Sequence, residues 1–158
     1  MSPDLSSAPG PTPSDRRAVT LERTGPGAFR LRNARGGVLD VGTGPDDFSP
    51  VELLLAALAG CAAVNIEEIT SRRAQPTSFA ITASGRPVRD AEGGRLEDLV
   101  VDLAAAFGPG EAGDAARAIL ARTVRQTHER ICTVSRTVER GTPVDYRIDG
   151  APPLDPTG

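Results

Sequence analysis

Apolar residues recur at every second position between residues 17 and 41, as in Val19 and Leu21 and again in Phe29 and Leu31. Glycine-rich stretches separate these runs from one another. A period of two is typical of a β-strand, because successive side chains of a strand point to opposite faces. This segment therefore predicts short strands in an antiparallel meander.

The pattern changes sharply at Ser49. This residue suits a helix N-cap, Pro50 suits the first helical position, and Glu52 lies three residues after the cap, which together form a capping box. Phe48 and Leu53 flank the cap and are placed to form a hydrophobic staple around it. The sequence predicts that a helix begins here.

The body of this helix is apolar and is expected to run to about Arg72, ahead of Pro76. Its middle, Ala56 to Ala63, consists almost entirely of small residues and contains Cys61. Small side chains allow another backbone to approach closely. We therefore interpret this segment as a buried central helix.

Period-two alternation returns after the helix. It begins at Phe79 and continues through Ala83, and a second, longer run extends from Leu99 to Phe107. The residues from Asp90 to Gly94 separate the two runs and are typical of a turn. The sequence predicts two strands joined as a hairpin.

Asp114 can cap a second helix, which is expected to end near Cys132. Two further short strands are predicted over Val134 to Arg140 and Val144 to Ile148, with Gly141 to Pro143 between them. Hairpin-like connections favour antiparallel sheets, so the fold class expected is α+β rather than doubly wound α/β. We predict a single domain over residues 17–149, a disordered Pro/Ser-rich leader over 1–16 and a flexible Pro-rich tail over 150–158.

Composition excludes several classes of function. The chain of 158 residues has a net charge of −3, contains no Lys, and only 3% of its residues are aromatic. These features argue against nucleic-acid binding and against binding to an anionic membrane surface. We find no apolar run that approaches about 18 residues, and the leader has no apolar region typical of a signal peptide, so we expect a cytoplasmic protein without a membrane span.

Two cysteines are the main candidates for chemistry. Cys61 lies in the middle of the first helix, where it is either a small buried hydrophobe or a reactive thiol. Cys132 is expected near a helix C-terminus, where the helix dipole disfavours a thiolate, so it suits a resolving role better than an attacking one. His128 lies four residues earlier on the same helix face and is either an exposed surface residue or a partner of Cys132. Two cysteines and one His are too few for a structural zinc site, and we expect no metal.

Charged candidates are less distinctive. Glu52 already has a role in the capping box, and it precedes Cys61 by nine residues, which places the two side chains about 180° apart around an ideal helix. Arginines are abundant in the predicted meander, among them Arg23 and Arg30. Spacing alone does not choose between them.

Two long motifs resemble the OsmC-like family of thiol proteins. Ser49 to Cys61 resembles the SPxELLLAALxGC helix of this family, and Glu129 to Ser135 resembles its second cysteine segment, EKYCxVS. The separation of the two motifs also matches, so that the resemblance covers roughly residues 17–149. Val51 stands where the peroxidase branches of the family usually carry Glu, so the chain looks closer to the branch with a plain SPxEL motif.

This resemblance implies an intertwined homodimer with two active sites at its interface. It further implies that Cys61 attacks a peroxide to form a sulfenic acid, that Cys132 resolves it to a disulfide, and that an external, lipoyl-type dithiol reduces the disulfide. No bound cofactor is expected. Glu52 and either Arg23 or Arg30 are weaker catalytic candidates by the same resemblance.

The predicted function is therefore a thiol-dependent peroxidase that reduces organic hydroperoxides. The alternative is a dimer without peroxidase activity that binds a small ligand or a sulfur species in its interfacial pocket. A redox-sensing or structural role would need an exposed apolar patch, which the sequence does not reveal.

Overall fold

The structure is a computed structural model that describes residues 16–153. The chain divides between Leu53 and Leu54 into two compact units, each of which is considered by itself. The predicted leader lies outside the described residues except for Arg16, and so do residues 154–158 of the predicted tail. The prediction of one domain over residues 17–149 stays a prediction.

The N-terminal unit contains the predicted antiparallel meander. Strands β1 (Val19–Gly25), β2 (Ala28–Asn33) and β3 (Val38–Gly42) form one sheet in the order β1-β2-β3. Leu31 of the middle strand lies opposite both Leu21 and Leu39. Because cross-strand partners share a face, the period-two pattern gathers the apolar side chains on one side of the sheet.

Helix α1 (Pro50–Ser71) begins at the predicted cap. Glu52 accepts a hydrogen bond from the Ser49 amide at 2.8 Å, and the Glu52 amide donates to Ser49 Oγ at 3.2 Å. The capping box is confirmed, and the helix ends one residue before the predicted end. The staple between Phe48 and Leu53 stays a prediction.

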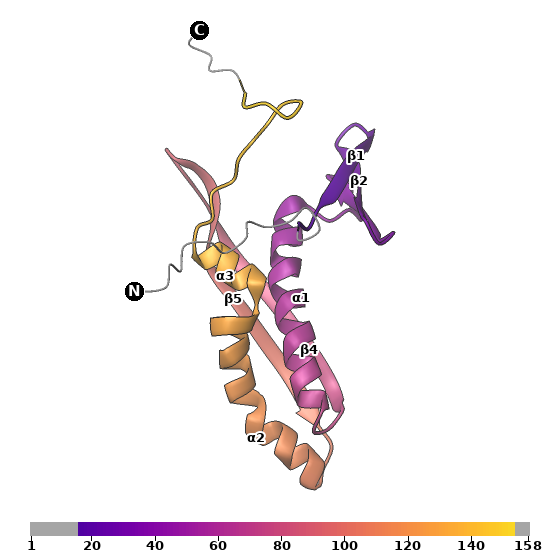
Figure 1. Cartoon of the computed structure of the whole chain (residues 1–158), viewed down its shortest axis with the longest axis vertical. Coiled ribbons are helices and arrows are strands. Elements are labelled where there is room, and N and C mark those ends of the chain that lie inside the picture. The colour runs from indigo at the N-terminus through magenta and orange to yellow at the C-terminus, as the bar shows by residue number, and fades with distance from the viewer. Residues whose placement is uncertain (1–15, 154–158) are drawn as a thin grey trace, which may run out of the picture. The chain divides into compact units, whose positions relative to one another are not determined.

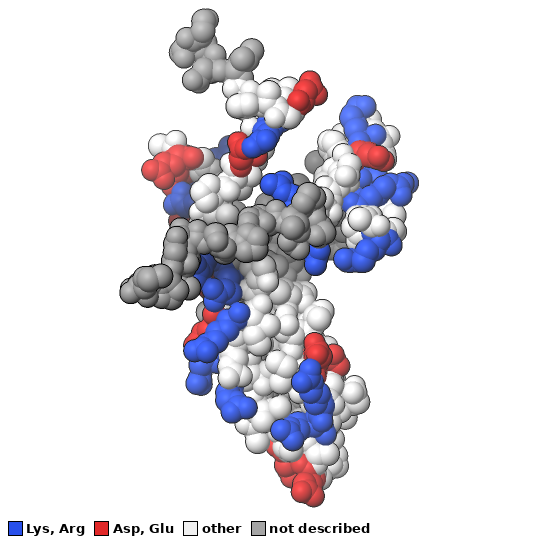
Figure 2. Space-filling model, viewed as in Figure 1, with Lys and Arg blue, Asp and Glu red and all other residues white. Residues whose placement is uncertain are grey.

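Beyond Leu54, α1 buries one stripe at a spacing of four residues, formed by Leu58, Ala62, Ile66 and Thr70. Thr70 satisfies its buried hydroxyl by donating to the Ile66 carbonyl at 2.8 Å. The exposed positions of the helix from Leu54 to Val64 are apolar as well. Figure 2 shows a largely uncharged surface over α1 in this unit.

The expectation that no segment is long and apolar enough to span a membrane was wrong. Helix α1 has 22 residues and an 18-residue window with a mean hydropathy of 1.6, of which 22% is buried within the chain. The continuous apolar run in the sequence is shorter than the apolar window of the helix, because Asn65, Glu67 and Glu68 interrupt it near its end. Length and composition of this kind are equally typical of a core helix in a soluble protein.

A long antiparallel hairpin follows, made of β4 (Pro76–Asp90) and β5 (Gly93–Phe107), and the predicted turn joins the two strands. The register shifts between Ser84 and Arg86, opposite the segment in which Asp98 has a positive φ of 52°. Figure 1 shows α1 and α2 (Glu111–Gln126) alongside this hairpin. Asp114 was predicted as the N-cap of α2, but Gly110 occupies that position and Asp114 instead pairs with Arg117.

The predicted strand over Val134 to Arg140 was wrong. A π-helical turn, η2 (Thr127–Ile131), continues α2, and α3 (Thr133–Glu139) begins directly after Cys132. The alternation of Val134 and Val138 with polar residues also fits an i, i+4 helical spacing, and short apolar runs do not separate the two periods.

The second predicted strand, Val144 to Ile148, is absent as well. Within the described residues this segment forms only an isolated bridge between Ile148 and Ala151. The fold class is nevertheless confirmed as α+β, with antiparallel sheets and three α-helices in the described chain.

Candidate active site

The structure brings the two cysteines together from separate elements. Cys61 lies half-buried on α1, and Cys132 lies between η2 and α3 with only 1% of its surface exposed. Both are free thiols, and they are close enough that each shifts the pKa of the other. The predicted proximity of the two cysteines is therefore seen within one unit of a single chain.

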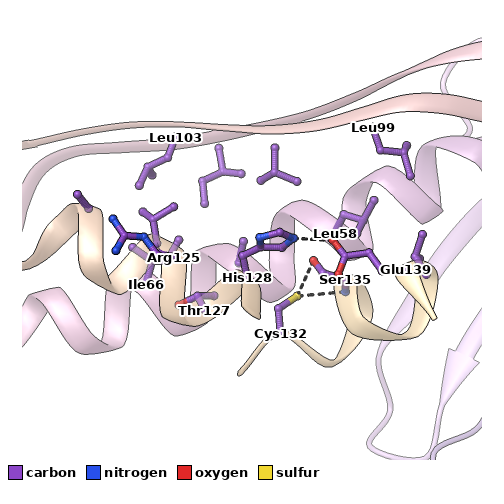
Figure 3. A pocket seen from close by; sticks show the side chains of 16 residues that line it. Leu58, Ile66, Leu99, Leu103, Arg125, Thr127, His128, Cys132, Ser135 and Glu139 are labelled. Atoms are coloured by element: carbon purple, nitrogen blue, oxygen red, sulfur yellow. Dashed lines mark hydrogen bonds and ion pairs between the residues drawn. The ribbon is translucent and has the colours of Figure 1, made fainter. Parts of the chain in front are cut away.

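Hydrogen bonds from Ser135 surround the sulfur of Cys132. The Ser135 hydroxyl donates to Cys132 Sγ at 3.2 Å, and the Ser135 amide donates at 3.4 Å (Figure 3). Burial raises the pKa of the Cys132 thiol, but hydrogen bonding from Cys61 and from Ser135 outweighs it, so the pKa falls below its ordinary value.

This finding corrects the prediction that a helix dipole disfavours a Cys132 thiolate. Cys132 does follow the end of one helical segment, but it is also the N-cap of α3. Its side chain therefore accepts hydrogen bonds from the start of the next helix, as an N-cap oxygen ordinarily does. The sequence suggested a strand after Cys132, and this hid the cap.

The environment of Cys61 shifts the pKa of its thiol in the opposite direction, upward. Burial raises the pKa of the Cys61 thiol, and hydrogen bonding to Cys132 raises it further, against the smaller effects of the Val134 and Thr133 amides. The Asn65 side-chain amide donates mainly to the Cys61 carbonyl at 2.7 Å and lies 3.9 Å from its sulfur. The two thiols therefore form one interacting pair, in which backbone amides from the start of α3 reach both sulfur atoms.

A cavity of about 400 Å³ lies beside this pair in the C-terminal unit. Apolar side chains from α1, the hairpin and α2 make up most of its wall, among them Leu58, Ala62, Ile66, Ile81, Leu99, Val101, Leu103 and Val124. Cys132 and Ser135 also line this cavity, whereas Cys61 does not. Figure 3 shows the hairpin on one side of the pocket and helices on the other.

Polar groups are few in the pocket. Glu139 approaches His128 with 2.5 Å between Oε1 and Nε2, and the His128 ring points toward Glu139 in Figure 3. His128 thus pairs with a carboxylate of α3 and is an exposed surface residue, which is the first of the two alternatives, rather than a partner of Cys132. Thr127 is 1% exposed, and its hydroxyl oxygen has no hydrogen-bond partner among the described residues.

Ser135, Thr127 and Glu139 were missed from the sequence. A signal existed for Ser135, because a polar side chain three residues after a cap is a recurring cap partner. Cys is not among the usual cap residues, which are Ser, Thr, Asp and Asn, so the sequence pattern does not mark Cys132 as a cap.

The remaining candidates belong to the N-terminal unit. Glu52 is engaged by Ser49, as its capping role predicts. Arg30 forms a bidentate pair with Asp40, at 2.8 and 3.3 Å. Arg23 lies opposite Phe29 on the apolar face of the sheet, whereas Arg30 lies opposite Glu22 on the other face. Their assignment to the site stays a prediction.

The OsmC-like protein family profile matches residues 42–147, which include both cysteine motifs and the strands between them. An uncharacterized protein of Mycobacterium tuberculosis is 32% identical over 133 residues, covering 81% of this chain and 93% of its own length.

This chain belongs to the OsmC-like family.

Solved structures of OsmC-like proteins share the fold. An OsmC-like protein of unknown function from Vibrio cholerae superposes with a TM-score of 0.65 at 15% identity, covering 78% of this chain and 94% of its own. An organic hydroperoxide resistance protein OsmC from Legionella pneumophila gives a TM-score of 0.51 at 19% identity, covering 78% and 88%. Membership in the OsmC-like family suggests a redox or peroxide-related role for this chain.

Proposed function

We propose that this OsmC-like protein is a thiol-dependent peroxidase that reduces organic hydroperoxides through Cys61 and Cys132. The observation that carries the proposal is the pairing of these two thiols, from α1 and from the start of α3, at a range where each shifts the pKa of the other. Two neighbouring free thiols with unequal pKa values are suited to sulfenic acid formation followed by disulfide closure. The name of the Legionella pneumophila structure points to the same chemistry.

The cycle needs only the peroxide and a reductant. One sulfur attacks the terminal peroxide oxygen, so that an S–O bond forms and the O–O bond breaks, giving a sulfenic acid and an alcohol. The other sulfur then displaces hydroxide, which leaves as water, and a disulfide forms. In the order that the family resemblance implies, Cys61 attacks and Cys132 resolves. An external dithiol of the lipoyl type restores both thiols by thiol–disulfide exchange.

The pocket favours an organic hydroperoxide over hydrogen peroxide as the substrate. Its wall is mainly aliphatic, and a cavity of about 400 Å³ has room for a small organic molecule. Hydrogen peroxide would gain nothing from such a surface, whereas an alkyl or aryl group would bury apolar area there.

We further propose that the working form is a homodimer in the cytoplasm. An added Cβ at Gly60 would meet nothing within 4 Å, and Ala57 and Val64 on the same side of α1 are exposed. A continuous apolar helix face left open in one chain is suited to packing against a second copy.

Peroxide consumption by the purified protein tests the proposal. Cumene hydroperoxide and hydrogen peroxide would be compared, with dihydrolipoamide as the reductant. We expect faster turnover of cumene hydroperoxide, and loss of turnover in both Cys61→Ser and Cys132→Ser. A Thr137→Val variant removes a hydroxyl of α3 outside the pocket and serves as the matched control. Full turnover in Cys61→Ser, or none in the fully reduced wild-type protein, would contradict the proposal.

A second candidate function is binding of a small ligand without turnover. The buried Thr127 hydroxyl lines the pocket without a partner, and a buried unpaired hydroxyl is costly unless something satisfies it. A ligand with an apolar body and one polar group would do so. Calorimetric titration with cumyl alcohol, which has the shape of the peroxide but no O–O bond, separates the two functions: binding without any peroxide turnover favours this second candidate.

A further inference from the structure

We infer that the pocket of the C-terminal unit binds a short organic molecule that carries a carboxylate, and that Arg125 and Thr127 select for this group. Naming the substrate as a carboxylate-bearing hydroperoxide rests on the proposed peroxidase function. Binding of the carboxylate can be measured without any turnover.

Arg125 carries the unpaired charge of the pocket. Apart from Cys132, the ionisable residues in the cavity wall are Arg125, His128 and Glu139. His128 and Glu139 are paired with each other, with 2.5 Å between Nε2 and Oε1. Arg125, in the last turn of α2, is exposed and has no carboxylate partner among the described residues. A guanidinium at the edge of an apolar cavity is suited to a carboxylate, which accepts two parallel hydrogen bonds from it.

A buried hydroxyl in the same wall is the second observation. Thr127 is 1% exposed, it lines the cavity, and its Oγ1 has no hydrogen-bond partner in the described part of the chain. A helical Thr ordinarily bonds the carbonyl four residues earlier, as Thr70 does at 2.8 Å. Thr127 instead begins the π-helical turn η2. An unpaired donor in an apolar wall costs free energy, and an anionic acceptor compensates it better than a neutral one.

The arrangement of charges fixes the direction in which the ligand lies. Cys132 follows Arg125 by seven positions along α2 and η2, which corresponds to about 10 Å at the rise of an α-helix. Figure 3 shows Arg125 and Cys132 apart, with His128 between them and Glu139 on the Cys132 side. The negative charge of Glu139 disfavours a carboxylate at that end. The carboxylate is therefore expected at Arg125, and the opposite end of the ligand points toward the thiol pair.

The middle of the pocket sets the size of the ligand. Leu58, Ile66 and Leu103 contribute to its aliphatic wall, and the cavity volume is about 400 Å³. Such a cavity holds a single ring or a short chain and buries its apolar surface. The ligand class is therefore a compact apolar body with a carboxylate at one end. For the proposed peroxidase, the hydroperoxide group is at the other end.

Binding of two matched alcohols tests the selection for a carboxylate. Cumyl alcohol and its para-carboxy derivative have the same apolar body, and neither contains an O–O bond. Calorimetric titration of the wild-type protein should give several-fold tighter binding of the para-carboxy derivative. Because Arg125 is exposed, this preference should shrink as the ionic strength rises. Equal affinities, or no binding of either alcohol, would overturn the inference.

Substitutions locate the carboxylate in the pocket. Arg125→Gln should remove the preference for the para-carboxy derivative and leave the affinity for cumyl alcohol nearly unchanged. Arg122→Gln is the matched control, because it removes the same charge from an exposed position of α2 outside the pocket wall. A purely structural role of Arg125 at the end of α2 would lower stability without changing the ratio of the two affinities. A preference that survives Arg125→Gln contradicts the site.

Thr127→Val tests the buried hydroxyl separately. This change keeps the shape of the side chain and removes the donor, so the preference for the carboxylate should fall. An unchanged preference would overturn the role given to Thr127.

Turnover extends the test to the substrate. Cumene hydroperoxide would be compared with its para-carboxy derivative, with dihydrolipoamide as the reductant. We expect Arg125→Gln to raise KM for the para-carboxy hydroperoxide several-fold with little change in kcat, and to leave both constants for cumene hydroperoxide nearly unchanged. Equal constants for the two hydroperoxides in the wild-type protein would overturn the substrate class. If the wild-type protein consumes neither hydroperoxide but still prefers the carboxylated alcohol, the proposed peroxidase function fails and the carboxylate site stands.

Discussion

Glu52 accepts hydrogen bonds from both the amide and the hydroxyl of Ser49, at 2.8 and 2.7 Å, and its own amide donates to Ser49 Oγ at 3.2 Å. The backbone hydrogen bond from Ser49, followed by the hydroxyl, holds the pKa of the Glu52 carboxyl below its usual range. This reciprocal arrangement fixes the first turn of α1, the helix that carries Cys61.

The Glu52 pKa predicts how stability depends on pH. The hydrogen bonds from Ser49 favour the ionised form of Glu52 in the folded protein. Their contribution to the free energy of unfolding is therefore fully present above the ordinary Glu pKa, and it is lost as pH falls through the lower pKa of the folded state. Glu52→Gln keeps an acceptor at this position but removes the charge. We expect this variant to unfold at lower denaturant than the wild-type protein at neutral pH, with a difference that shrinks below about pH 4. Equal denaturation midpoints at neutral pH would contradict the prediction.

Oxidation of the thiol pair should stabilise the protein. A Cys61–Cys132 disulfide would close a loop of about 70 residues, which corresponds to at most about 4.4 kcal/mol in the chain-entropy treatment. We expect a higher thermal midpoint for the oxidised wild-type protein than for the reduced one, measured by circular dichroism. Cys61→Ser, treated with the same oxidant, should show no such difference.

Much of the fold followed from the sequence because its signals are local. The capping box at Ser49 and the alternation around Phe79 each involve neighbours in the chain, and both were predicted correctly. The prediction of a strand over Val134 to Arg140 was wrong for a physical reason. Its pattern satisfies both a strand and a helical spacing, and the cap that decides in favour of the helix is a sulfur atom.

The site was less predictable than the fold. The two cysteines were identified from their motifs, but the pKa ordering depends on Ser135 and on burial, neither of which has a periodic signature. The His128–Glu139 pair needed the turn at Cys132 that folds α3 back toward η2. Sequence spacing gave no basis for choosing between Arg23 and Arg30, whereas the strand register places them on opposite faces.

The two arginines are expected to behave differently in catalysis. Arg30 is bound by Asp40, and this hydrogen-bonded pair holds the pKa of the Asp40 carboxyl below its usual range. Arg23 has no ion-pair partner in the described part of the chain, so no carboxylate engages its guanidinium. We predict that Arg23→Gln lowers the rate of cumene hydroperoxide consumption several-fold and that Arg30→Gln leaves it nearly unchanged. The reverse result would show that the pair with Asp40 opens during catalysis.

The open face of α1 predicts the effect of a larger side chain at Gly60. An added Cβ there meets nothing within one chain, so Gly60→Ala should stabilise an isolated chain by up to about 1 kcal/mol through helix propensity. Against a closely packed second copy, the same position would have little room. We therefore expect Gly60→Leu to shift the protein toward monomer in sedimentation equilibrium, whereas Ala118→Leu, at an exposed position of α2, should not. An unchanged dimer in Gly60→Leu would place the contact between copies elsewhere, and a monomeric wild-type protein would contradict the proposed homodimer itself.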